Sequence, residues 1–372
     1  MHALGIVAEY NPFHTGHAYH IEKAKKETAA DGVIAVMSGN FVQRGEPAIL
    51  DKWTRAFHAI SGGVDLVLEL PTVYALSSAE GFARGAIETL KSTGIVRTLS
   101  FGSECGDIAL LKRAANILEE DLPHFREVLQ KELREGRSYA AARMVALAAI
   151  DAEAAKLLLE PNNILGVHYL RFAKDLAVHT VKREGSGYLA EEIEEGFPSA
   201  MALRQKLLSG EPVGAYVKKP IAVEELHTLE EYADLILYAV KATNWQAFET
   251  IPDAVKKRIA SADTSSLSAL LESAKTRHIP MATLKRALLQ ILLQNTRTAE
   301  EKPQYIRALG FTDRGQEILK EMKKTAHLPI ITRPAAFSEP SPIWELENRA
   351  TDIYFLGERR VGENIRRAPV KA

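Results

Sequence analysis

The sequence predicts an α/β protein in which a doubly wound parallel sheet is followed by a mainly helical C-terminal part. In the first part, short apolar segments alternate with longer segments of helical periodicity, as in a parallel sheet covered by helices. In the last part, helical periodicity continues with little strand character. Crossovers between parallel strands are right-handed in nearly all proteins, so ligands of such a sheet bind at the carboxyl ends of its strands.

The first domain is expected over residues 1–215. Its strands are predicted at 4–8, 33–37, 66–70, 98–102 and 178–183. Its helices are predicted at 17–29, 52–60, 78–90 and 199–208, with a helical insertion over about 107–160. The last of these strands returns the chain to the sheet after the insertion.

The second domain is expected over residues 216–372. Its main helices are predicted at 226–242, 247–261, 265–277 and 281–294. The stretch 357–372 is charged, and we expect it to end in a mobile tail. The chain of 372 residues is 46% hydrophobic and 26% charged, which is enough apolar material for two cores.

Composition limits the location and the class of partner. The 47 Lys and Arg residues balance 48 Asp and Glu residues, so no overall basic excess indicates a nucleic-acid partner. No apolar run approaches the ~20 residues of a membrane-spanning helix, and the N-terminus lacks the features of a secretory signal. The single cysteine, Cys105, cannot form an internal disulfide, so we expect a reducing compartment, the cytoplasm.

A His-x-Gly-His tetrapeptide lies where the first strand meets the first helix. Backbone N–H groups and the dipole at a helix start favour an anion, and His14 and His17 can donate hydrogen bonds to phosphate oxygens. Gly16 between them has no side chain to block a nucleotide. We expect His14 and His17 to be catalytic and to stabilise charge that develops on an α-phosphate. His20, one turn further on, either lines the same pocket or is a partly exposed helix residue.

Paired histidines also occur as metal ligands and as ordinary surface residues. No third ligand with convincing spacing accompanies His14 and His17, so no protein-bound metal site is predicted. The position of the pair directly after the first strand favours a phosphate site.

Around this tetrapeptide the sequence resembles a known family. The segment 5–17, Gly-Ile-Val-Ala-Glu-Tyr-Asn-Pro-Phe-His-Thr-Gly-His, resembles the opening of the bacterial tRNA(Met) cytidine acetate ligases, a branch of the nucleotidyltransferases that carry His-x-Gly-His. Further matching motifs follow in the same order at 37–48, 101–104, 161–166 and 305–311. The resemblance implies a HIGH-type, Rossmann-like nucleotidyltransferase domain.

The resemblance also implies an activity. Members of that family activate acetate with ATP to give acetyl-adenylate, and then transfer the acetyl group to N4 of the wobble cytidine of elongator tRNA(Met). The product is N4-acetylcytidine. ATP is then a substrate, and Mg²⁺ is expected to assist the first step.

The same resemblance implies a set of ATP-binding residues. They are Val7, Ala8, Glu9, Tyr10, Asn11, Pro12, Phe13, His14, Thr15, Gly16, His17, Ala18, Tyr19, His20, Gly102, Asn162, Arg183 and Glu184. Gly102 ends a strand where a side chain would collide with the ligand. Asn162 either binds the base or ribose or caps the helix that follows it. Arg183 either pairs with a phosphate or forms a surface ion pair with Glu184.

Two segments depart from the family pattern. Tyr188 is followed by Leu189 where the family has histidine, and 198–204 is a loosened form of a Ser/Thr-rich segment ending in Ile-Arg. These departures put in doubt a phosphate role for Ser199 and Arg204.

A tRNA partner requires basic surface, and we expect the helical domain 216–372 to be a platform for tRNA. The candidate tRNA-binding residues are Lys23, Lys26, Lys218, Lys219, Lys285 and Arg286. Lys25 lies beside the first pair, and Arg359, Arg360, Arg366 and Arg367 form a third basic cluster near the C-terminus. Without the resemblance, each cluster would be interpreted as an ordinary solvated surface.

Two other functions use the same motif. A nucleotide adenylyltransferase or a small-molecule ligase of coenzyme synthesis would need no long helical half. A non-catalytic nucleotide-sensing or RNA-binding protein would not need His14, Gly16 and His17 to be intact.

Overall fold

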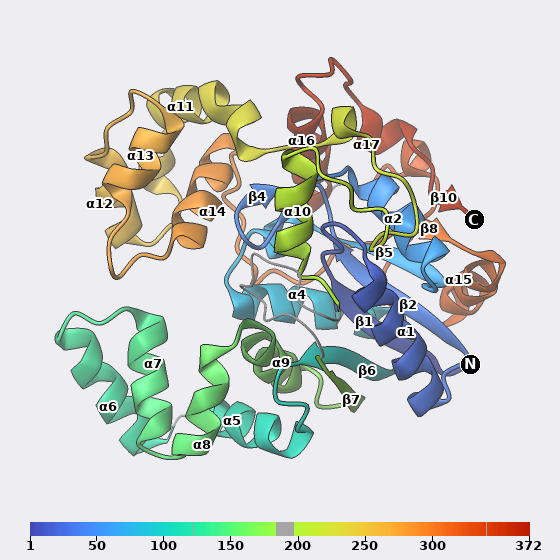
Figure 1. The fold of residues 1–372 in the computed structure, drawn as a ribbon, viewed down its shortest axis with the longest axis horizontal. Helices are drawn as coiled ribbons and strands as arrows, with labels where there is room; N and C mark the ends of the chain where they lie inside the picture. The colour runs from blue at the N-terminus through green and yellow to red at the C-terminus, as the bar shows by residue number, and fades with distance from the viewer. Residues whose placement is uncertain (121, 184–196, 340) are drawn as a thin grey trace.

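The structure, a computed structural model, describes residues 1–120, 122–183, 197–339 and 341–372. A single twisted sheet forms its centre, and helices cover both faces (Figure 1). The strand order is β10-β8-β5-β2-β1-β6-β7, with β9 beside β8. The strands are β1 Ala3–Ala8, β2 Gly32–Ser38, β5 Leu66–Leu70, β6 Val96–Ser103, β7 Ala177–Lys182, β8 Ile306–Phe311, β9 Ile330–Ile331 and β10 Val370–Lys371. Neighbouring strands are parallel, except that β5 and β8 are antiparallel.

The strands of the first part are buried on both faces, and their side chains alternate between two apolar clusters. Ile34 and Val36 of β2 point into one cluster, and Val33 and Ala35 point into the other. Such burial is typical of parallel strands covered by helices on both sides. The five strands expected in the first part are confirmed with small shifts at their ends, and so is the α/β fold class.

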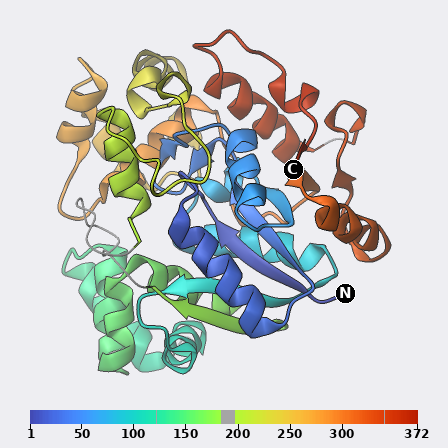
Figure 2. The same cartoon turned by 45° about the vertical axis from the view of Figure 1, so that its right-hand side comes forward.

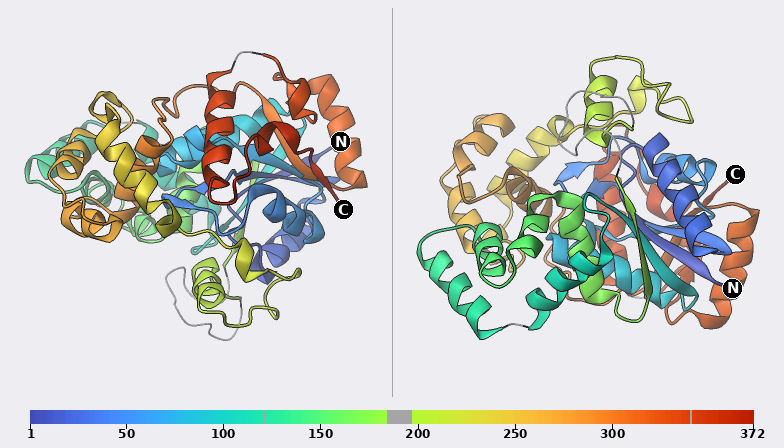
Figure 3. Two further views of the ribbon diagram at one scale, coloured as in Figure 1. Left: turned by 90° about the horizontal axis from the view of Figure 1, so that it is seen from above. Right: turned by 60° about the horizontal axis from the view of Figure 1, so that its bottom comes forward.

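Helices α1 and α2 pack on one face of the sheet, and α4, α9 and α15 pack on the other (Figures 2 and 3). Their bounds are α1 Thr15–Thr28, α2 Lys52–Ser61, α4 Ala79–Ser92, α9 Pro161–Phe172 and α15 Asp313–Thr325. The side chains of His14, Asp51 and Ser78 accept backbone N–H groups at the starts of α1, α2 and α4. These caps satisfy backbone N–H groups that have no acceptor within the helix, so each helix begins at the residue after its cap.

Two helical units lie on the same side of the molecule, to the left in Figure 1, the first against β7 and the second against the hairpin β3–β4. The first is the insertion after β6, with α5 Ile108–Glu120, α6 Pro123–Arg134, α7 Tyr139–Ala148, α8 Ala152–Lys156 and η1 Leu157–Leu159. The second contains η3 Leu229–Tyr232, α11 Ala233–Ala242, η4 Trp245–Ala247, α12 Asp253–Ala260, α13 Leu267–Ala274 and α14 Met281–Leu292. Within the described ranges, no helix is long and apolar enough to cross a membrane.

Smaller elements complete the fold. They are the hairpin β3 Phe41–Val42 and β4 Glu46–Pro47, and the helices α3 Thr72–Ala75, α10 Ala200–Leu208, η2 Val223–Glu225, η5 Pro334–Ala336, α16 Pro342–Tyr354 and α17 Glu363–Arg366. Ser199 accepts the N–H of Ala202 and so caps α10.

The C-terminal part differs from the mainly helical domain expected over 216–372. β8 pairs with β5 and β10 pairs with β8, so this part returns to the sheet. Ile306, Ala308 and Leu309 are buried and lie in the two clusters on either face. The segment from Ile306 onward therefore belongs with the sheet, and the separate helical unit ends near α14.

The expected mobile tail is also wrong. Asn364 of α17 is fully buried, and its side-chain oxygen accepts hydrogen bonds from Lys52 Nζ at 2.7 Å and from the Arg307 guanidinium. Arg307 also donates to the Asn364 carbonyl at 2.8 Å. Lys52 and Arg307 in turn pair with the buried carboxylate of Glu69. The short helix α17, near the C-terminus, thus completes a buried polar network.

Replacement of Asn364 with alanine is expected to lower the free energy of unfolding by about 2 to 4 kcal/mol, because two buried cations lose an acceptor. The neighbouring Ile365, which is 41% exposed, supplies the matched control Ile365→Ala. Guanidinium unfolding followed by circular dichroism measures both. Equal values for the two variants would contradict a structural role for this network.

Candidate active site

A cavity opens at the carboxyl ends of β1, β6 and β7, as expected for a sheet of this topology. Its walls come from the end of β1, the start of α1, the hairpin β3–β4, α9 and α10. Of the expected ATP-binding residues, those that line it are Val7, Ala8, Glu9, Tyr10, Asn11, His14, Gly16, His17, Tyr19, His20, Gly102, Asn162 and Arg183.

The remaining expected residues have other places. Pro12, Phe13, Thr15 and Ala18 do not line the cavity. Phe13 is buried under α2, where its ring fills the space that a side chain at Gly62 would need. Glu184 lies outside the described residues.

His14 and His17 form a reciprocal cap at the start of α1. The Gly16 N–H donates to His14 Nδ1 at 3.1 Å, and the His14 N–H donates to His17 Nδ1 at 3.2 Å. The two rings lie 3.8 Å apart between centroids. A Cβ at Gly16 would come within 3.0 Å of the His14 ring, so glycine is needed here for the histidine as well as for a ligand.

These hydrogen bonds determine which nitrogen carries the proton. A neutral imidazole has one acceptor nitrogen and one donor nitrogen. Because Nδ1 of each ring accepts a backbone N–H, the proton of His14 and of His17 lies on Nε2. Each ring therefore offers an N–H donor to a bound phosphate.

Burial and nearby positive charges keep the three histidines neutral. Burial, with the Arg183 charge, lowers the pKa of His14 to about 3. Burial, His14, Arg183 and His20 lower the pKa of His17 well below its usual value. Burial, His179 and Arg183 lower the pKa of His20 to about 4. Arg183 acts on all three rings, so the cavity combines neutral donors with a nearby positive charge, which suits a polyphosphate.

A hydrogen-bonded chain holds His20. His20 Nε2 lies 2.9 Å from Ser100 Oγ, and Ser100 Oγ lies 3.0 Å from His179 Nδ1. His179 Nε2 pairs with Glu27 at 2.8 Å. This chain joins α1 to β6 and β7 and fixes the ring of His20 in the cavity wall.

Two of the family-like motifs interlock beside Gly102. The Glu104 carboxylate accepts the backbone N–H groups of Asn162 and Asn163, and the Asn162 side chain donates to it at 2.6 Å. In return, Asn163 Oδ1 accepts the N–H groups of Glu104 and Cys105. Asn162 lines the cavity but does not cap α9, whose N-cap is Glu160 without a side-chain cap hydrogen bond. A contact of Asn162 with the base or ribose stays a prediction.

The hairpin β3–β4 supplies the opposite wall. The Gln43 N–H donates to Glu9 Oε1 at 2.7 Å, and Arg44 also lines the cavity. Gly45 has a φ of 75° and lies so close to α14 that a Cβ would meet the backbone N of Arg286 at 2.4 Å. Arg286 donates to the Gln43 carbonyl at 2.9 Å, and Lys285 pairs with Glu46.

The expected tRNA-binding residues fall into two groups. Lys285 and Arg286 are engaged with the hairpin, and burial lowers the pKa of Arg286 to about 10. Lys23 donates to the Tyr19 hydroxyl at 3.3 Å, and Lys219 lies over the Phe57 ring. Lys26 and Lys218 are exposed. Lys285 and Arg286 position the hairpin. Any RNA contact is therefore left mainly to the other four lysines.

Several cavity residues are not among those expected from the sequence. They are Ile6, Gln43, Arg44, Phe82, Phe101, Leu165, Tyr169, Val181, Lys182, Phe197, Pro198, Ala200 and Met201, with Arg204 held in doubt. Gln43 and Arg44 follow the second strand, which is a signal that could have found them. Arg204 does reach the cavity, where it donates to the Asn11 carbonyl at 2.7 Å.

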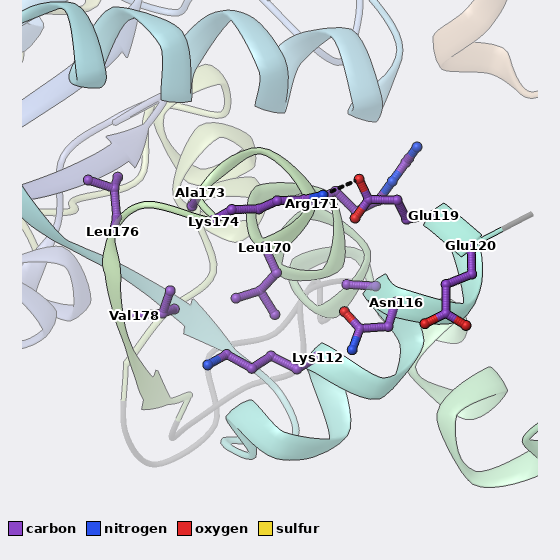
Figure 4. A pocket seen from close by; sticks show the side chains of 11 residues that line it. Lys112, Asn116, Glu119, Glu120, Leu170, Arg171, Ala173, Lys174, Leu176 and Val178 are labelled. Carbon is purple, nitrogen blue, oxygen red and sulfur yellow. Dashed lines mark ion pairs between the residues drawn. The ribbon is translucent and has the colours of Figure 1, made fainter.

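A second cavity lies between α5, α9 and β7 (Figure 4). Its floor includes Leu170 and Val178, and its rim carries the ion pair of Lys174 with Glu119 at 2.6 Å. Its lining includes no histidine, and it lies away from the carboxyl end of β1. The chemistry of the first cavity is absent from it.

Comparisons with known proteins show the family of the chain. A family model described as HIGH Nucleotidyl Transferase matches residues 1–367. The tRNA(Met) cytidine acetate ligases of Caldanaerobacter subterraneus subsp. tengcongensis and Caldicellulosiruptor saccharolyticus are 39% and 40% identical to this chain. Both alignments cover 96% of this chain, and they cover 95% and 94% of the relatives. The chain belongs to the tRNA(Met) cytidine acetate ligase family.

Solved structures of this family have the same fold. Apo Thermotoga maritima TmcAL matches with a TM-score of 0.88 and 32% identity, over 100% of this chain and 99% of that chain. TmcAL bound with alpha-thio ATP matches with a TM-score of 0.86 and 33% identity, over the same shares of both chains. The resemblance found in the sequence and the nucleotidyltransferase fold are thus confirmed.

His14→Asn is expected to weaken ATP binding about 10- to 100-fold, because asparagine can still accept the Gly16 N–H but lacks the Nε2 donor. Titration calorimetry measures the ATP affinity, and His124→Asn on the exposed face of α6 is the matched control. An unchanged affinity in His14→Asn would remove this ring from the phosphate site.

Gly102→Val is expected to weaken ATP binding at least tenfold while the free energy of unfolding changes by less than about 0.5 kcal/mol. The protein has room for a Cβ here, since its nearest atom would be Arg183 Cγ at 3.5 Å, so a loss would report the ligand. Gly214→Val, in open space, is the control. A destabilised variant would show that the glycine serves the fold instead.

Proposed function

We propose that this protein activates acetate with ATP and transfers the acetyl group to N4 of the wobble cytidine of elongator tRNA(Met). The observation that carries the proposal is the pair of neutral imidazoles with Nε2 donors at the β1–α1 junction, in a chain of this family. The names of the relatives supply the substrates of the proposal.

In the first step, an acetate oxygen attacks the α-phosphorus of ATP and pyrophosphate leaves. The Nε2–H groups of His14 and His17 donate to phosphate oxygens, where they stabilise charge as it develops. Arg183 adds a positive charge beside them. The protein acts by position and electrostatics, without a covalent intermediate.

Mg²⁺ fits this site as a companion of ATP. Within the described ranges, no group of three or more His, Cys, Asp or Glu side chains is placed to hold a metal ion. Mg²⁺ commonly binds through substrate phosphates and water with few protein ligands. The ion, when bound, neutralises charge on the triphosphate while the histidines orient the α-phosphate.

In the second step, the cytidine N4 attacks the carbonyl carbon of acetyl-adenylate and AMP leaves. The wobble base must be splayed from the anticodon loop to reach the cavity. Lys23, Lys26, Lys218 and Lys219 remain the candidate contacts for the RNA backbone. We place the reaction in the cytoplasm because the single cysteine and the tRNA substrate both fit that compartment.

The test is incubation with ATP, labelled acetate and an unmodified elongator tRNA(Met) transcript, followed by nuclease digestion and mass spectrometry. N4-acetylcytidine is expected at the wobble position, and a transcript with uridine there is the matched control. Label that appears only in a small molecule would favour an adenylyltransferase or small-molecule ligase. Absence of any ATP turnover would favour a non-catalytic nucleotide-binding protein.

A further inference from the structure

We infer that Glu9 is the general base that takes the proton from the cytidine N4 during acetyl transfer. The inference rests on the proposed function and supplies the group that its second step lacks. Glu9 directly follows β1 and lines the cavity together with His14 and His17. Among the described residues that line the cavity, Glu9 is the sole carboxylate.

Glu9, which the resemblance implies as an ATP-binding residue, is held on the side of β1 away from Gly102 and Arg183. β1 lies between β2 and β6 in the sheet. Gly102 and Arg183, proposed for ATP, lie at the ends of β6 and β7 on one side of β1. The Glu9 carboxylate instead accepts a hydrogen bond from the Gln43 N–H, in the hairpin that follows β2 on the other side of β1. With the α-phosphate at the histidines, this side is left for the acceptor.

The geometry holds one carboxylate oxygen in place. Glu9 Oε1 accepts the Gln43 N–H at 2.7 Å, and the Glu9 carbonyl accepts from the Arg55 guanidinium at 2.7 Å. Both contacts use backbone groups or a buried side chain, so neither depends on a mobile surface residue. A carboxylate fixed in this way faces a bound base without a large loss of rotamer entropy.

The other titratable groups in the cavity are poor bases. His14 and His17 already carry a proton on Nε2, the nitrogen that is free to face a ligand. His20 Nε2 is bonded to Ser100. Burial raises the pKa of the Tyr10 hydroxyl, so this group stays protonated. None of these four residues is therefore as well placed as Glu9 to accept a proton from the substrate.

The proton balance of the step is complete. A bond forms between N4 and the acetyl carbon, and the bond from that carbon to the AMP phosphate oxygen breaks with its electron pair on the oxygen. The N4 proton passes to the Glu9 carboxylate and then to water as the products leave. No oxidant, reductant or further reactant is needed.

The surroundings of Glu9 tune its basicity in opposing directions. Burial raises its pKa, while the Gln43 N–H and the charges of Arg44, Arg204 and Arg55 lower it, and the net shift is upward. These three arginines come from the hairpin, α10 and α2. A carboxylate is a better base when its pKa lies closer to the working pH, so the upward shift favours the role.

Glu9→Gln separates this role from ATP binding. Glutamine is nearly isosteric and can still accept the Gln43 N–H, but it cannot take a proton. Because Glu9 also lines the ATP cavity, we expect the loss in acetate-dependent exchange of pyrophosphate into ATP to be at least tenfold smaller than the loss in acetyl transfer. We expect acetyl transfer to tRNA, measured in a single turnover from preformed adenylate, to fall about 10²- to 10⁴-fold. Hydroxylamine should trap the accumulated acetyl-adenylate as acetohydroxamate.

The pH profile adds a second readout. In wild type, the transfer rate is expected to rise with pH through the raised pKa of Glu9 and then to level off, because only the carboxylate accepts a proton. The Glu9→Gln variant should lose that rise, and Glu9→Asp should keep it at a reduced rate. The matched control is Glu22→Gln, on the exposed face of α1.

Three outcomes would overturn the inference. Equal losses in pyrophosphate exchange and in transfer would make Glu9 a ligand of ATP or of its Mg²⁺. Unchanged transfer in Glu9→Gln would assign the proton to the departing AMP phosphate. An unchanged pH profile despite slower transfer would make Glu9 a positioning residue. Failure of the proposed function is distinguishable, since wild type would then exchange no pyrophosphate in the presence of acetate.

Discussion

The candidate site depends on the hydrogen bonds that the buried guanidinium of Arg55 donates to backbone carbonyl groups. The guanidinium donates to the carbonyl groups of Glu9 at 2.7 Å, Ser38 at 3.0 Å and Leu50 at 2.9 Å, and also to that of Gly39. These groups lie at the carboxyl ends of β1 and β2 and just before α2. A single fully buried side chain therefore joins the end of β1, which lines the cavity, to the end of β2, and its four carbonyl acceptors offset the cost of burying a charge.

The chain that follows β1 is held from both sides as a consequence. Tyr10 adopts a φ of 47°, which is unusual for a residue with a side chain. The carbonyl before it accepts from Arg55, and the Asn11 carbonyl after it accepts from Arg204. The turn so defined delivers His14 to the cap of α1, where its Nδ1 meets the Gly16 N–H. Backbone hydrogen bonds thus determine the tautomer on which the proposed phosphate contacts depend.

The sequence predicted the parts of the fold that rest on local patterns. Segments such as 33–37 are apolar on both faces, which is the signature of a central parallel strand, and His14 to His17 stand at a recognisable strand–helix junction. The strand β8 was missed because it is antiparallel to β5 and distant from it in sequence. The burial of Asn364 was missed because its partners, Lys52 and Arg307, lie far away along the chain. Periodicity carries no information about such long-range polar pairs.

The separate motifs that resemble the family are contact partners in three dimensions. The segment 101–104 interlocks with 161–166 through Glu104 and the two asparagines. In the segment 37–48, the Gln43 N–H donates a hydrogen bond to Glu9 of the opening motif, and the Asn40 side chain accepts the N–H of Lys52. These four motifs therefore form two pairs that support the cavity walls, whereas the fifth motif, 305–311, contains β8 and lies outside the cavity lining. A substitution in either member of a pair removes hydrogen bonds that the other member needs. The joint presence of both members therefore argues for an intact site more strongly than the histidines alone.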